Sequence, residues 1–101
     1  MRSDDRPYLV ERRRPRDEAL ASAIEPLGFV RDDDYLPDGT ASHFVGPRGS
    51  GLAVTYVGFQ QLRLWAGRGG RVRYTGFRFS AGREAAVLER LAAAIAKEVS
   101  R

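Results

Sequence analysis

The order of apolar and polar residues along the chain predicts a helix near each end and strands between them. The first helix carries apolar residues at the i, i+3, i+4, i+7 spacing of one helix face, namely Leu20, Ala23, Ile24 and Leu27. Pro15 suits the first helical position, and Pro26 with Gly28 ends the element. A short amphipathic helix is therefore expected over about residues 15–26.

The second helix is longer and follows Ser80, a residue type that favours the N-cap position. Its apolar stripe consists of Leu88, Leu91, Ile95 and Val99. Because an amphipathic helix buries such a stripe, this helix is expected to cover one face of a sheet.

Five segments between the helices alternate with turn-forming residues and predict strands: 29–36, 41–45, 52–57, 61–66 and 71–79. Pro37, Asp38 and Gly39 are typical of a hairpin turn, and glycines separate the later segments. Since all the connections are short, the strands are expected to form an antiparallel meander.

The two faces of this sheet differ in chemistry. One face is apolar and available to both helices, with Leu52, Val54, Tyr56, Leu62, Leu64 and Val72. The other face carries Thr55, Gln61, Arg63, Trp65, Arg71 and Arg73. Phe77 and Phe79 fall on the wrong side of their strand unless one extra residue shifts the register, so a β-bulge is expected at Thr75-Gly76.

Length and composition support one domain. A chain of 101 residues that is 43% hydrophobic can form one core but not two. Residues 1–14 lack a sustained period and predict a flexible basic tail, with Tyr8-Leu9-Val10 as a candidate edge strand. Residues 15–101 predict a single α+β domain: a short helix, a meander of about five strands, and a long helix packed on one sheet face.

The absence of cysteine rules out disulfides, thiolate zinc sites and cysteine nucleophiles. No run of eighteen apolar residues is present, and the N-terminus leads into charges rather than an apolar stretch. The sequence therefore predicts a cytoplasmic protein with no membrane contact.

The net charge is +4, and all the basic residues except Lys97 are arginine. A genome rich in G and C would account for much of this arginine, so its distribution is more informative than its total. Residues 41–80 hold six arginines and neither Asp nor Glu. The positive excess therefore lies in the predicted sheet.

The residues that carry chemistry do not form a catalytic constellation. His43 is the single histidine, and a lone strand histidine is more often structural than catalytic. Asp32, Asp33 and Asp34 invite a calcium interpretation, but the spacing of the later ligand positions fails. The glycine loops lead into strands, whereas a phosphate cradle leads into a helix. No enzyme, metal or cofactor is expected.

The leading interpretation is a non-catalytic interaction module, such as an adaptor, immunity or chaperone-like protein, that binds a protein partner or itself. Its binding residues would be Gln61, Arg63, Trp65, Arg71 and Arg73, since Trp and Arg are enriched at protein interfaces. The alternative is a nucleic-acid binder that uses the same face. An arginine-rich arm would then supply candidate phosphate contacts, at Arg12, Arg13, Arg14 and Arg16. A third interpretation is an ordinary solvated face with Trp65 lying under arginine stems.

Overall fold

A computed structural model describes residues 7–34, 41–57, 60–67 and 72–100, with the backbone alone described at 7–14 and 72–76. The helices are α1 (Pro7–Ile24) and α2 (Glu84–Val99), and a 3₁₀ turn, Glu25–Leu27, follows α1. The strands are β1 (Val30–Arg31), β2 (Ala41–Val45), β3 (Ala53–Val57), β4 (Gln61–Trp65) and β5 (Val72–Arg78).

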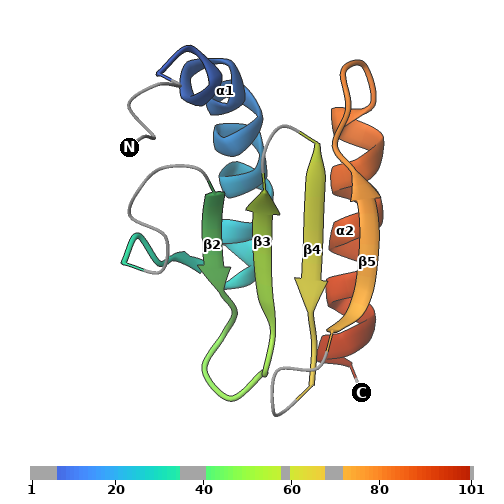
Figure 1. The fold of residues 1–101 in the computed structure, drawn as a ribbon. Coiled ribbons are helices and arrows are strands. Elements are labelled where there is room, and N and C mark those ends of the chain that lie inside the picture. The colour runs from blue at the N-terminus through green and yellow to red at the C-terminus, as the bar shows by residue number, and fades with distance from the viewer. Residues whose placement is uncertain (1–6, 35–40, 58–59, 68–71, 101) are drawn as a thin grey trace.

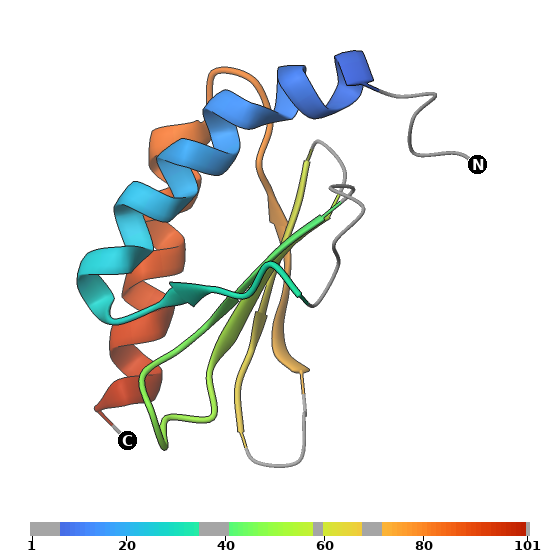
Figure 2. The ribbon, with the colours of Figure 1, turned by 90° about the vertical axis from the view of Figure 1, so that its left-hand side faces the viewer.

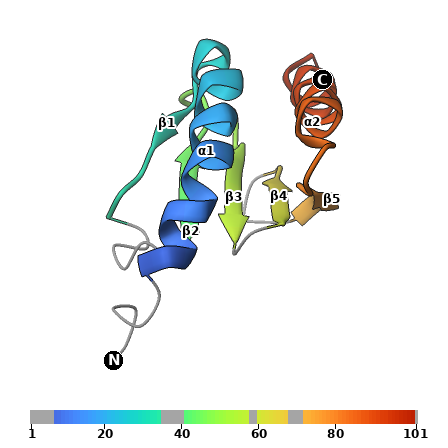
Figure 3. The same cartoon turned by 90° about the horizontal axis from the view of Figure 1, so that it is seen from above.

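The strands form one antiparallel sheet in the order β1-β2-β3-β4-β5, so each strand pairs with its neighbour in the sequence (Figure 1). Both helices pack on the same side of this sheet (Figure 2). Seen from above, α1 lies over the β1–β3 side and α2 over the β5 side (Figure 3). The expected α+β fold, with a meander between two helices, is confirmed.

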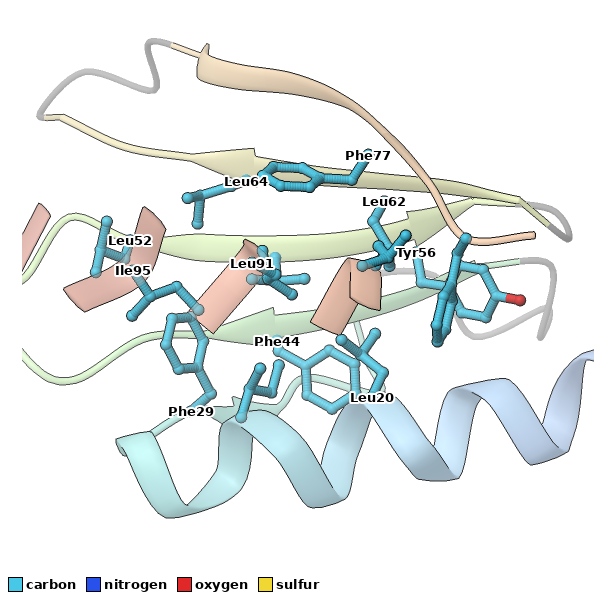
Figure 4. Close-up of a cluster of buried hydrophobic side chains, with 14 of the residues drawn as sticks. Leu20, Phe29, Phe44, Leu52, Tyr56, Leu62, Leu64, Phe77, Leu91 and Ile95 are labelled. Carbon is cyan, nitrogen blue, oxygen red and sulfur yellow. The ribbon is translucent and has the colours of Figure 1, made fainter. Parts of the chain in front are cut away.

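The core fills the space between the helices and the covered face of the sheet. Leu20 from α1 and Leu91 from α2 are both fully buried there (Figure 4). The sheet contributes Phe44, Val54, Tyr56, Leu62 and Leu64, all with no exposed surface. The Tyr56 and Phe79 rings meet edge to face at a centroid distance of 5.4 Å, an arrangement that aromatic pairs favour.

The first helix begins at Pro7 rather than at Pro15. Tyr8, Leu9 and Val10 are helical, so the expectation of an edge strand there was wrong. Pro15 lies inside α1, where it has no N–H to donate to the preceding turn. The helix changes direction along its length (Figure 2), and an internal proline is the usual cause of such a bend. The predicted flexibility of residues 1–14 stays a prediction.

The second helix also differs at its start. It begins at Glu84 with Arg83 at the N-cap, and Ser80 instead closes the preceding turn, where its carbonyl accepts from the Arg83 N–H at 3.1 Å. Val87, Leu91 and Ile95 form the buried stripe, whereas Val99 at its end is 59% exposed.

The register of β5 contains the expected irregularity. Leu62 is opposite Phe77 and Leu64 is opposite Tyr74, so two steps along β4 correspond to three along β5. The extra residue lies within Thr75-Gly76, which confirms the predicted bulge.

A second shift follows before Val72, which is opposite Trp65 rather than aligned with Leu62 and Leu64. The side chain of Val72 lies outside the described part of the chain, so its expected place on the apolar face stays a prediction.

The first strand is shorter than expected. Its ladder covers Val30 and Arg31, after which the chain turns at residues 33–34, and the predicted Pro37-Asp38-Gly39 hairpin lies outside the described residues. Neither described helix is long and apolar enough to cross a membrane.

Candidate functional site

The side of the sheet that neither helix covers, here called the open face, is the surface that the sequence singled out (Figure 2). The register of the five strands aligns its residues in three rows that run across the sheet, the first two from β1 to β4 and the third from β2 to β5. These rows decide which side chains are neighbours, because cross-strand partners lie about 5 Å apart.

The first row is apolar and consists of Val30, Val45, Ala53 and Trp65, one residue from each of β1–β4. Val30 is 67% exposed and Val45 is 44% exposed, and both lie outside the core. Contiguous apolar residues that remain open to solvent mark a surface suited to contact with another molecule.

The second row is polar and consists of Asp32, His43, Thr55 and Arg63. Asp32 extends the β1 ladder, because its N–H donates to the His43 carbonyl over 2.7 Å. The row therefore carries a carboxylate at one end and a guanidinium at the other.

Thr55 is the centre of a hydrogen-bonded cluster on this face. Its hydroxyl accepts from Trp65 Nε1–H at 2.9 Å and lies 3.0 Å from His43 Nδ1. Since the hydroxyl accepts from Trp65, its own proton can be donated to Nδ1 when His43 is neutral. Three strands are thus joined through a side chain that is only 6% exposed.

Burial lowers the pKa of His43 below its usual value, and the nearby Asp32 carboxylate opposes this effect. The neutral imidazole is therefore the favoured form near pH 7, and in this form Nδ1 is able to accept from the Thr55 hydroxyl.

The third row consists of Ala41, Val57, Gln61 and Arg78. Gln61 accepts a long hydrogen bond, 3.4 Å, from the exposed Arg63 guanidinium, and Arg78 is exposed opposite Gln61. The positive groups of the open face therefore lie on its β4–β5 side, opposite Asp32 on the β1 side.

The structure brings Gln61, Arg63 and Trp65 together on β4, as the alternation predicts. Arg71 lies outside the described residues, and Arg73 is described by its backbone alone. The predicted roles of Arg71 and Arg73 in partner binding stay predictions.

The arginine-rich arm differs from its predicted form. Arg12, Arg13 and Arg14 lie within α1, and their side chains are outside the described part of the chain. Arg16 donates from Nε to Glu84 Oε2 at 3.2 Å and so connects α1 with α2. This ion pair favours a structural role for Arg16.

Sequence analysis missed Val30, Val45 and Ala53 as members of the open face. Phe44 and Val54 are buried, and Val45 and Ala53 are their neighbours in the sequence. The alternation within 41–45 and 52–57 therefore already indicated that Val45 and Ala53 lie on the other face of the sheet. No comparable signal marked Val30, whose strand is two residues long.

Within the described ranges, no group of three His, Asp or Glu side chains is placed to hold a metal ion. The Asp32 carboxylate instead accepts from the Asp34 N–H at 3.2 Å, a local turn contact. The acidic segment thus serves the geometry of the turn that follows β1.

Comparisons with known proteins provide no relative for this chain. No protein-family model matches it, and neither curated proteins nor solved structures contain a match. Function must therefore be argued from the open face itself.

Proposed function

We propose that the protein is a non-catalytic interaction module that binds a folded protein surface on its open face. The observation that carries this proposal is the pairing of an apolar row, Val30 to Trp65, whose two valines are exposed, with a polar row that ends in Arg63. Protein interfaces combine an apolar centre with polar groups at the rim, and Trp and Arg are their usual anchors.

The hydrogen bonds around Thr55 indicate a preorganised binding surface, whose side chains are already fixed before a partner binds. Trp65 is held by its hydrogen bond to Thr55, so less side-chain freedom is lost when a partner covers the indole. His43 is held by the same hydroxyl. An aromatic side chain fixed before binding is the form that a hot-spot residue takes.

Nucleic-acid binding is the second candidate, favoured by the six arginines and the absence of acidic residues within 41–80. Two features of the open face argue against it. A single-strand platform stacks successive bases on aromatic rings, whereas Trp65 is the one aromatic side chain described on this face. Val30 and Val45 offer no contact to phosphate.

Site-specific photocrosslinking tests the proposal. A benzophenone amino acid placed at Val45 samples the open face, and the same group at Val99 samples an exposed position on α2. Irradiation in the native host is expected to give a protein adduct from position 45 and little from position 99. Adducts from neither position, or equal adducts from both, would contradict binding on the open face.

Oligonucleotide binding measured over a series of salt concentrations distinguishes nucleic-acid binding from protein binding. Affinity for mixed single- and double-stranded oligonucleotides must fall steeply with salt if arginines displace counterions from phosphate. Binding that is strong at low salt, falls in this way and is lost on replacement of Arg63 and Arg78 would favour nucleic acid over protein.

A further inference from the structure

We infer that the occupant of the open face is a second copy of this chain, packed face to face about a two-fold axis parallel to the strands. The axis passes between β2 and β3. This inference rests on the proposed function and deepens it, because it names the partner of that same face. Its basis is the order of charges and side-chain sizes along the rows.

A rotation about this axis exchanges β1 with β4 and β2 with β3 while each row stays at its own level. Asp32, at the β1 end of the polar row, then faces Arg63 of the second copy, at the β4 end. Arg63 faces Asp32 of the second copy in the same way. A two-fold interface always repeats a contact, so one dimer contains two such ion pairs, one at each margin.

The apolar row is complementary under the same rotation. Val30, the most exposed member, faces Trp65 of the second copy, and Val45 faces the small side chain of Ala53. In the middle of the polar row, His43 faces Thr55. Large residues thus meet smaller ones, as in the interdigitated faces of packed sheets.

The charges also exclude the other simple arrangement. A two-fold axis across the strands, along the polar row, would place Arg63 on Arg63 and Asp32 on Asp32. Like charges brought together in an interface strongly oppose association. Charge complementarity therefore selects the axis that runs along the strands, subject to the usual rotation of about 30° between two packed sheets.

The extent of the face indicates a reversible dimer. Two rows of four strands and a third row that β1 does not reach cover at most roughly 19 Å by 16 Å, from the ordinary spacings of a sheet. An interface of this extent belongs to the small, transient class rather than to obligate dimers. Association is therefore expected at micromolar to millimolar concentrations.

Charge reversal tests the arrangement by analytical ultracentrifugation over about 1 µM to 1 mM. The wild-type chain of 11.2 kDa is expected to shift towards twice this mass as its concentration rises. Arg63→Asp and Asp32→Arg, made separately, each create two repulsive pairs and are expected to weaken association by about tenfold or more.

An equimolar mixture of the two single variants is expected to restore association. In the mixed dimer, Asp32 of one chain faces Arg63 of the other, and the two introduced residues also face each other with opposite charges. The double variant within one chain is likewise expected to dimerise. Recovery on mixing also shows that both single variants are folded.

The control pair is Arg83→Asp and Glu89→Arg, which makes the same charge changes at exposed positions at or near α2, on the covered side of the sheet. These variants are expected to dimerise like the wild type. A wild-type chain that stays monomeric to 1 mM, or variants that fail to recover on mixing, would overturn the inference. The proposed function fails separately, if position 45 gives no protein adduct of any kind.

Discussion

Trp65 on β4 donates its indole N–H to the hydroxyl of Thr55 on β3, and the two atoms are 2.9 Å apart. The same hydroxyl is 3.0 Å from Nδ1 of His43 on β2, so one buried oxygen connects three strands. Trp65 is the single tryptophan of the chain, and its fluorescence therefore reports on this cluster alone. A variant that changes the cluster is expected to change both stability and emission.

Replacement of Thr55 by Val keeps the shape of the side chain but removes the oxygen. Trp65 and His43 then lose their shared partner, and the free energy of unfolding is expected to fall by about 1–3 kcal/mol. Urea unfolding followed by Trp65 fluorescence measures this loss. Thr55→Ser, which keeps the hydroxyl, is expected to lose less; an equal loss in both variants would show that the methyl group matters rather than the hydrogen bonds.

Stability is expected to fall as the pH drops below about 6.5, the ordinary pKa of histidine. Burial lowers the pKa of His43 in the folded state, so the unfolded chain binds the proton first and is favoured as the pH falls through this range. Above pH 6.5 the neutral His43 makes its full contribution to the free energy of unfolding. This contribution is lost once the pH falls below the pKa of His43 in the folded protein.

Unfolding free energies measured between pH 5 and pH 8 test this expectation, with His43→Asn as the comparison. Asparagine retains an acceptor near the position of Nδ1 but does not titrate in this range. A pH dependence below 6.5 that is unchanged in the variant would exclude His43 as its source.

The Arg31–Asp17 ion pair connects β1 with α1. Arg31 Nη1 donates to Asp17 Oδ2 at 2.7 Å, and its guanidinium lies 4.8 Å from the centre of the Phe44 ring. The other Asp17 oxygen is buried with no hydrogen-bond partner among the described residues, so this carboxylate depends on Arg31. Arg31→Met is expected to cost about 2 kcal/mol, because it leaves the carboxylate without its cation.

Asp17→Asn removes the charge that needs compensation and is expected to cost less, about 1 kcal/mol. A double-mutant cycle with both variants is expected to give a coupling free energy of about 1 kcal/mol. Additive effects of the two changes would mean that the pair contributes no coupling and that β1 is held by packing alone.

Alanine substitutions at two glycines with positive φ distinguish the cost of backbone strain from the cost of a steric clash. Gly28 has a φ of 97°, and a Cβ added there would lie 2.8 Å from Pro47 Cγ. Gly49 has a φ of 82°, with no atom within 4 Å of such a Cβ. Gly49→Ala is expected to cost about 1 kcal/mol from strain alone.

Gly28→Ala adds a clash with a ring that has little freedom to move, and it is expected to cost roughly 1 kcal/mol more than Gly49→Ala. Chemical denaturation of both variants measures the difference. Equal losses would show that the Pro47 ring adjusts without cost.

The features that followed from the sequence are those encoded by short-range patterns. Alternation placed Arg63 and Trp65 on one face of β4, and the parity of Phe77 and Phe79 located the bulge. In each case, burying the apolar residues of the strand fixes which face every other residue of that strand must lie on. A second shift within β5 could not be found in this way, because two one-residue shifts restore the original parity.

Other features depend on contacts between distant parts of the chain. The segment 7–14 has no apolar period, so nothing in it signals a helix that continues through Pro15. The rows of the open face depend on the register of three separate strand pairs, which no single segment specifies. The placement of Asp32 and Arg63 in the same row, at its two ends, is therefore visible only in the structure.

The sequential order of the sheet bears on how the chain acquires its structure. Each of β2–β5 pairs with the strand just before it, so strand pairing requires only short loops to close. Contacts between the ends of the chain, such as Arg16 with Glu84, span 68 residues. Local pairing of this kind lowers the contact order and favours rapid folding for a sheet protein.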